Sequence, residues 1–142
     1  MFTSSVSIYS PNWACLITFN TINLVGIKML KTIPEVIAQA RQSLNTITAA
    51  DAAEKCKNEN GIIIDVREPA EFADKAANNS INIPRGLLEM QMLQMHPDEN
   101  LVIFIHCATG ARATFAAEQL KRVGYKNVWV VTCMLNEVCC AF

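Results

Sequence analysis

The chain has 142 residues, of which 51% are hydrophobic and 18% are charged, and its formal net charge is -1. This length suits one domain with a sizeable core, and this composition is globular rather than disordered. Because the charge is close to zero and no long basic run occurs, electrostatics give no support for binding to nucleic acid or to an anionic membrane.

The cysteine spacing excludes the common metal-binding patterns. The chain contains no CxxC pair and no histidine at metal-ligand spacing among its six cysteines, which are Cys15, Cys56, Cys107, Cys133, Cys139 and Cys140. We therefore expect neither a metal nor another cofactor. A core of this size does not need disulfides, so we expect free thiols in a reducing compartment.

The first 27 residues differ from the rest because they carry no charged side chain, and the first basic residue is Lys28. A secretory signal starts with positive charge, and polar residues interrupt the apolar run over 13–27, so we expect no membrane span. We predict a poorly ordered or atypical extension over residues 1–30, a folded domain over 31–142 and a cytoplasmic location. Met29 resembles a natural amino terminus. The alternative is a periplasmic protein whose first 27 residues act as an export signal.

From residue 32 onward the pattern becomes regular. Thr32 and Pro34 predict the start of a helix that runs to about Ser43. A short extended piece over 45–47 leads to a second helix from Ala49 to about Lys57, with Gly61 as the glycine that ends it. The run over 62–66 is rich in β-branched residues, which is typical of a strand buried on both faces of a parallel sheet.

Strands and helices continue to alternate to the end of the chain. We predict a short helix from Pro69, a turn over 78–80, a strand over 81–84, a core-facing helical stripe over 87–95 and a central strand over 101–105. A helix from Ala111 to about Val123, stopped by Gly124, and a strand over 127–131 complete the pattern. This alternation predicts a right-handed α/β fold with a mostly parallel sheet.

Two segments rich in chemically useful side chains follow predicted strands. They are the stretch 65–67 and the pair His106 and Cys107. Sites in open α/β sheets form beyond the carboxyl ends of strands, so we expect both segments at one edge of the sheet.

The segment after Cys107 has the composition of a loop that holds an anion. Backbone N–H groups of residues 108–112 can converge on the sulfur, and the following helix adds positive potential, so both favour a thiolate. Gly110 permits a tight curl, while Ala108 and Ala111 add little bulk. Arg112 can direct its guanidinium at an anion bound above the sulfur.

Three motifs together make the chain resemble single-domain rhodaneses, which are thiosulfate sulfurtransferases. They are the segments 65–72 (DVREPAEF), 82–86 (NIPRG) and 107–113 (CATGARA), with a weaker match over 120–128, and the resemblance covers about residues 46–138. It implies a three-layer α/β fold whose five-stranded parallel sheet has the order 3-2-4-5-1, with helices on both faces.

The resemblance also implies a reaction. The Cys107 thiolate takes the outer sulfur of thiosulfate or a related donor, and the resulting persulfide passes it to cyanide or a cellular thiol. A thioredoxin-like protein or glutathione is a candidate acceptor. We expect no nucleic-acid or membrane partner, and a monomer or weak dimer.

The resemblance assigns Arg112, Arg67 and the loop residues Ala108, Thr109, Gly110 and Ala111 to the substrate pocket. Arg67 has an alternative role in an ion pair with Glu68 or Glu71. Asp65 is expected to support the loops through hydrogen bonds. Thr109 either contacts the persulfide or caps the helix. His106 is not expected to act as a base, because neighbours in a strand point opposite ways.

The loop length and one departure from the family bear on the choice of function. Related phosphatases and arsenate reductases place five residues between Cys and Arg, whereas four intervene here, which favours a cradle for a single sulfur. The family's Gly-Gly turn after the last strand is replaced by Cys133-Met134. Packing of Cys133, Cys139 and Cys140 is favoured over persulfide resolution. A persulfide carrier with little thiosulfate turnover and a noncatalytic binding module remain as alternatives.

Overall fold

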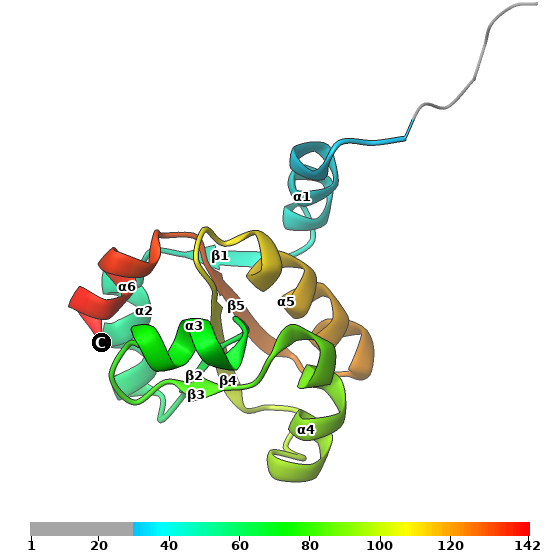
Figure 1. Ribbon diagram of the computed structural model, residues 1–142. Helices are drawn as coiled ribbons and strands as arrows, with labels where there is room; N and C mark the ends of the chain where they lie inside the picture. Colours follow the sequence, from blue (N-terminus) through cyan, green and yellow to red (C-terminus); the bar gives the residue numbers. More distant parts are fainter. Residues whose placement is uncertain (1–29) are drawn as a thin grey trace, which may run out of the picture. The chain divides into compact units, whose positions relative to one another are not determined.

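The computed structural model describes residues 30–142, of which Lys31–Phe142 form one compact unit (Figure 1). The expectations for an extension or export signal over the first 27 residues, and for Met29, therefore lie outside the described residues. Among the helices of residues 30–142, none combines the length and apolar character needed to cross a membrane.

Five parallel strands form one sheet in the order β1-β5-β4-β2-β3. The strands are β1 (Asn45–Ile47), β2 (Ile62–Asp65), β3 (Ile81–Asn82), β4 (Val102–His106) and β5 (Asn127–Val131). The helices are α1 (Ile33–Arg41), α2 (Ala49–Asn58), α3 (Pro69–Asp74), α4 (Leu88–Met95), α5 (Ala111–Val123) and α6 (Leu135–Ala141), and the 3₁₀ turn η1 (Arg85–Leu87) precedes α4. The predicted fold class and strand order are confirmed.

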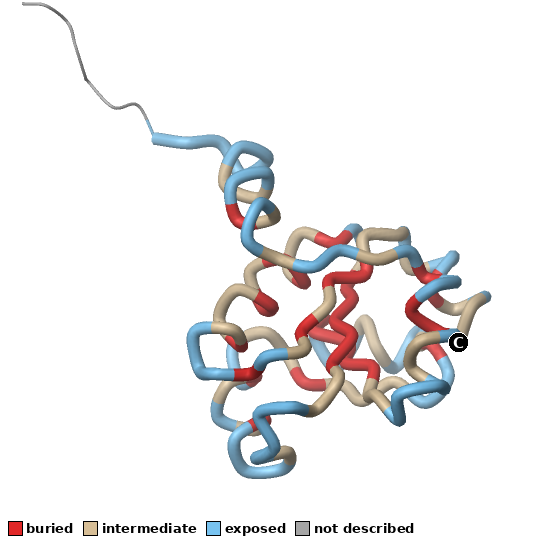
Figure 2. The backbone as a smooth tube through the Cα atoms, turned by 180° about the vertical axis from the view of Figure 1, so that it is seen from behind, coloured by how far each residue is buried: buried red, intermediate tan, exposed pale blue. Residues whose placement is uncertain are grey.

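The sheet is the middle of three layers. On one face, Leu88 and Met92 of α4 and Leu120 of α5 pack with Ile105 in a first hydrophobic cluster. On the other face, α2 and α6 pack with Phe104 in a second cluster. Successive residues of β4 therefore enter opposite layers, as the pleat of a strand requires. Figure 2 shows the buried positions concentrated along the central strands.

The helix starts follow the local sequence. Thr32 forms a capping box with Glu35 at the start of α1, and the Thr48 hydroxyl accepts a hydrogen bond from the Asp51 N–H at the start of α2. Each cap satisfies a backbone donor that the first helical turn leaves free. Both predicted starts are confirmed to within a residue.

The end of α2 differs from the prediction. Asn60, not Gly61, adopts the left-handed backbone, with φ of 51°. Gly61 is needed for space instead, because a Cβ atom there would lie 2.9 Å from the Phe104 ring and 3.0 Å from the Val102 carbonyl oxygen. The sequence alone suggests that Gly61 ends the helix. The reason for a glycine here is the close approach of β4 to this turn, which is a tertiary contact that the local sequence does not reveal.

Candidate functional site

Cys107 follows β4 directly and lies at the carboxyl edge of the sheet, and α5 begins four residues later. It is only 1% exposed and packs in the first hydrophobic cluster. The Gly110 N–H donates to its Sγ at 3.2 Å. We expected several loop amides to converge on the sulfur, but within residues 30–142 Gly110 supplies the only backbone hydrogen bond to it.

The loop is held in shape at Gly110, whose φ of 83° lies in the left-handed region. A Cβ atom there would lie 2.9 Å from Arg41 Nη2 and 3.3 Å from Thr132 Cα. Arg41 also donates to Thr114 Oγ1 at 3.1 Å, and that hydroxyl donates to the Gly110 carbonyl at 2.8 Å. Arg41 comes from α1, far from any motif, so only tertiary structure reveals its support of the loop.

The other residues of the loop are Ala108, Thr109 and Ala111, and none of their side chains contacts the Cys107 sulfur through a hydrogen bond. Thr109 is exposed, and α5 begins without a side-chain cap. Of the two alternatives for Thr109, the structure therefore does not support the helix cap, and contact with a persulfide stays a prediction. Ala108 accepts a hydrogen bond at its carbonyl from the Leu135 N–H at 3.1 Å, which attaches the start of α6 to the loop. Ala108 and Ala111 are half-buried.

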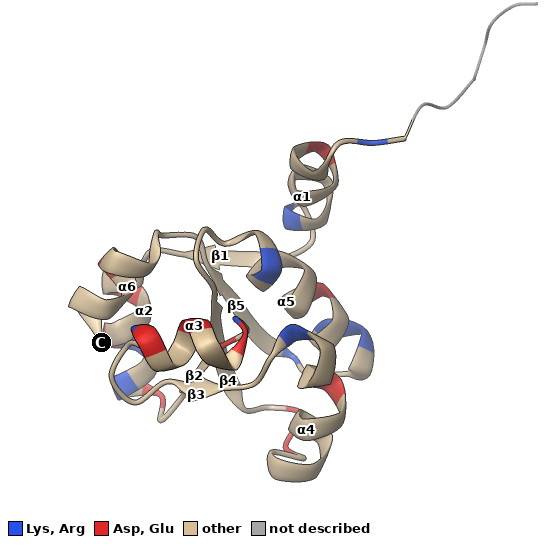
Figure 3. Ribbon diagram, viewed as in Figure 1, with Lys and Arg blue, Asp and Glu red and all other residues tan. Residues whose placement is uncertain are grey.

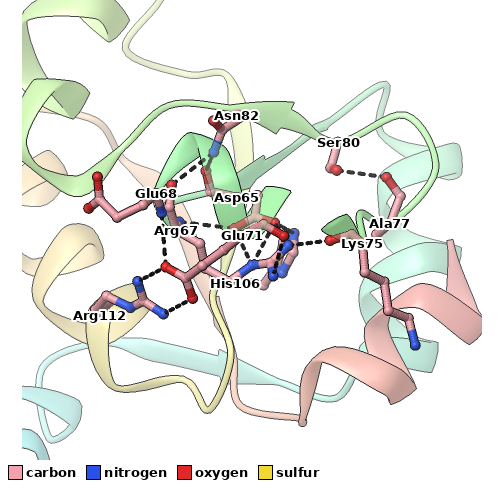
Figure 4. Close-up of polar contacts among 10 residues, drawn as sticks. All are labelled: Asp65, Arg67, Glu68, Glu71, Lys75, Ala77, Ser80, Asn82, His106 and Arg112. Atoms are coloured by element: carbon pink, nitrogen blue, oxygen red, sulfur yellow. Dashed lines mark hydrogen bonds and ion pairs between the residues drawn. The ribbon is translucent and has the colours of Figure 1, made fainter. Parts of the chain in front are cut away.

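Arg67 differs most from its expected place. It is 3% exposed, and it donates to both carboxylate oxygens of the fully buried Asp65 at 2.6 to 3.0 Å. It also donates to the backbone carbonyls of Glu71 at 3.1 Å and Lys75 at 2.6 Å (Figure 4). The guanidinium therefore ties β2 to α3 instead of lining the pocket, and its carboxylate partner is Asp65 rather than Glu68 or Glu71.

Asp65 has the structural place expected for it. Besides binding the Arg67 guanidinium, it accepts a hydrogen bond from the Arg67 N–H at 3.0 Å. The Asn82 side-chain amide donates to the carbonyls of Asp65 and Arg67, each at 3.0 Å. Sequence reasoning included Asn82 only as part of a motif, and its role at this edge was missed.

Arg112 also has a carboxylate partner. Its Nη1 and Nη2 atoms donate to the two Glu71 oxygens at 2.6 and 2.8 Å. This pair holds the pKa of Glu71 at about 2 and raises that of Arg112, to which the nearby Cys107 sulfur contributes less. The positive charge of Arg112 thus acts on the Cys107 sulfur, but both of its Nη atoms contact a carboxylate of the chain itself. Figure 3 shows acidic positions on α3 and a basic one at the start of α5.

His106 is fully buried and pairs across the strands with Asp65, whose Oδ2 lies 3.7 Å from its Nε2. Within residues 30–142, neither ring nitrogen has a hydrogen-bond partner. Burial lowers the pKa of His106, and the nearby Asp65 opposes this only partly. A neutral ring on the Asp65 side of the sheet agrees with the expectation that His106 is not the base for Cys107.

The turn that replaces the family's glycines is compatible with ordinary residues. Met134 is extended, with φ of -68° and ψ of 152°. The Ala49 N–H donates to Cys133 Sγ at 3.2 Å, and Cys133 and Cys139 pack against the second hydrophobic cluster. Cys107 packs in the first cluster on the other face. The structure therefore supports packing, rather than persulfide resolution, for these two thiols.

Comparisons with known proteins show the family to which the chain is related. The rhodanese-like domain model matches residues 48–138. The chain is 34% identical over 80 residues to the putative mitochondrial thiosulfate sulfurtransferase of Schizosaccharomyces pombe, a match that covers 47% of this chain and 55% of that protein. It is 35% identical over 66 residues to the putative sulfur carrier protein YrkF of Bacillus subtilis, covering 46% of this chain and 35% of that protein.

A solved structure is similar to this chain in its three-dimensional fold. A Rhodopseudomonas palustris protein of unknown function, described as a possible tyrosine phosphatase, is 25% identical with a TM-score of 0.66, covering 80% of this chain and 92% of that one. The family model spans well over half of the sequence, and the chain belongs to the rhodanese-like domain family.

Proposed function

We propose that the chain is a sulfurtransferase that carries a sulfane sulfur as a persulfide on Cys107. The observation that carries this proposal is the Cys107 loop, with the Gly110 N–H on Sγ and the Arg112 guanidinium beside it. A backbone donor and a fixed positive charge both stabilise a thiolate and, after transfer, an anionic persulfide. The names of the fission yeast and Bacillus relatives support sulfur handling by this family.

The reaction proceeds in two displacements. The Cys107 thiolate attacks the outer sulfur of thiosulfate or a related donor, the sulfur–sulfur bond of the donor breaks, and sulfite leaves with the bonding electrons. The terminal sulfur of the Cys107 persulfide is then attacked by cyanide or a thiol acceptor, and the Cys107 thiolate is the leaving group. This is covalent catalysis with ping-pong kinetics, and it requires no general base.

Two alternatives bear on this proposal. A persulfide carrier would load sulfur but turn over thiosulfate poorly, and the sulfur-carrier relative favours this reading. A phosphatase is disfavoured, although the Rhodopseudomonas neighbour is described as a possible one, because only four residues separate Cys107 from Arg112. A noncatalytic module would not require the Cys107 and Arg112 pair that this chain has.

Intact mass spectrometry after incubation with thiosulfate tests the proposal. We expect a gain of one sulfur atom per chain, which cyanide removes as thiocyanate and which Cys107→Ser abolishes. The Cys140→Ser variant is the matched control, because it removes an exposed thiol away from the loop and should leave loading unchanged. If Cys107 loads sulfur but the chain does not produce thiocyanate catalytically, the chain is a persulfide carrier. If no sulfane donor gives an adduct, sulfur transfer is excluded.

A further inference from the structure

The outer edge of the Arg112 guanidinium is already filled by Glu71. The two Nη atoms contact one carboxylate oxygen each, which is the bidentate geometry that an arginine uses to bind an oxyanion. Both side chains are more than a third exposed, so the pair lies where solutes reach it. A sulfonate or sulfate group approaching Arg112 must compete with this carboxylate (Figure 4).

Glu71 is fixed from its own helix as well. Its Oε2 accepts a hydrogen bond from the Glu68 N–H at 3.1 Å, which is part of the capping box at the start of α3. The carboxylate therefore has three hydrogen bonds before any substrate arrives. Because Arg112 lowers its pKa to about 2, Glu71 stays charged throughout the neutral range.

The other two arginines of the three motifs are compensated too. Arg67 is bound to Asp65, and Arg85, whose backbone N–H donates to the Val66 carbonyl at 3.2 Å, pairs with Glu89 at 2.9 Å. Each arginine from the three motifs thus has a carboxylate partner in the part of the chain that the structure describes. A dianionic donor therefore meets no uncompensated guanidinium among these three motif arginines, and at Arg112 it meets the negative charge of Glu71.

We propose that Glu71 is a specificity-determining residue that occupies Arg112 and so selects sulfur donors of low negative charge, such as persulfides and thiosulfonates, over the thiosulfate dianion. This inference rests on the proposed function and identifies its substrate class. Glu71 does not touch the reacting sulfur; it acts through Arg112. Releasing the guanidinium should improve binding of a dianion more than binding of a monoanion, because the dianion gains more from a free positive charge.

Glu71→Gln is the variant that tests the proposal. Glutamine keeps the size of the side chain and still serves in a capping box, so α3 should keep its start. The two donors are thiosulfate and methanethiosulfonate, a monoanion whose outer sulfur is attacked in the same way while methanesulfinate leaves. We expect the KM for thiosulfate to fall about three- to fivefold and that for methanethiosulfonate to change less than about twofold, with kcat nearly constant.

Asp74→Asn is the matched control, because it removes the same charge from an exposed position of the same helix. It should leave both KM values unchanged. A KM that falls equally for both donors, or that does not fall for thiosulfate, overturns the proposal. A KM that rises for both donors also overturns it and makes Glu71 a residue that merely positions Arg112.

A second measurement needs no turnover and separates this inference from the proposed function. Sulfate should protect Cys107 from alkylation by iodoacetamide, followed on the peptide that contains Cys107. Half-protection should need about three- to fivefold less sulfate in Glu71→Gln than in the unchanged chain. Equal protection in both chains excludes the role of Glu71. If no donor loads Cys107 in any variant, the proposed function fails, while the sulfate result still decides the role of Glu71.

Discussion

Arg67 and Asp65 are opposite charges that the fold buries almost completely. Asp65 is fully buried and Arg67 is 3% exposed. The Arg67 guanidinium donates only to the Asp65 carboxylate and to the carbonyls of Glu71 and Lys75 among the described residues. Removing one partner of such a pair leaves the other charge buried without compensation, which costs about 3–5 kcal/mol. The pair therefore matters for stability in a way that an exposed ion pair does not.

We predict that Arg67→Met lowers the free energy of unfolding by about 3–5 kcal/mol in urea denaturation. Arg122→Met, at an exposed position of α5, should change it by less than about 0.5 kcal/mol. The double variant Asp65→Leu/Arg67→Met should lose less stability than Arg67→Met alone, because no buried charge remains. A double variant whose loss of stability equals the sum of the losses in Arg67→Met and in Asp65→Leu, each measured alone, would refute this explanation.

Sequence reasoning located the charged residues of the site but not their partners. The motif order brought Asp65, Arg67 and Arg112 to one edge of the sheet, because parallel strands end together there. It did not reveal that Glu71 would meet Arg112. That contact joins α3 to α5 across 41 residues of sequence and depends on how the two helices pack. Partner choice among exposed charges is decided by tertiary geometry that local patterns do not encode.

At the scale of elements, the connection between β4 and α5 depends on one glycine. Gly110 combines a left-handed backbone with close neighbours on two sides, Arg41 and Thr132. It also supplies the N–H that contacts the Cys107 sulfur. A side chain at this position would disturb the loop, its supporting helix α1 and the thiol together.

We predict that Gly110→Ala lowers the free energy of unfolding by at least about 1–2 kcal/mol, the cost of a left-handed backbone for a residue with a Cβ atom. The rate at which thiosulfate loads Cys107 should fall as well, because the N–H moves away from the sulfur. Gly86→Ala is the control, since no atom lies within 4 Å of its added Cβ. If the two variants are equally stable, the tight loop is not a constraint on this fold.

The elements themselves were predictable for physical reasons that are visible locally. The β-branched run before Asp65 gave β2, and the caps at Thr32 and Thr48 gave the starts of two helices. Gly61 was misinterpreted because a glycine required for space and a glycine required for a positive φ look alike in a sequence. Only the position of the Phe104 ring distinguishes the two cases.

At the scale of the whole molecule, both hydrophobic clusters are built from residues 44–142 among those described. Helix α1 adds Arg41, which contacts Thr114 and the Gly110 carbonyl. The five strands and the layers on both faces of the sheet thus belong to the compact unit Lys31–Phe142. A unit with its own core and a complete sheet is expected to fold independently.

We therefore predict that a chain beginning at Lys31 unfolds cooperatively in urea, with a free energy of unfolding within about 1 kcal/mol of that of the full chain. Its Cys107 should load sulfur at the same rate, because the loop and its support from α1 are retained. A chain beginning at Leu44 is the comparison variant, because it keeps the five strands but lacks Arg41. Without the Arg41 contacts the Gly110 loop should be less ordered, and sulfur loading of Cys107 should be slower. A large loss of stability on removing residues 1–30 alone would show that the core extends into that segment.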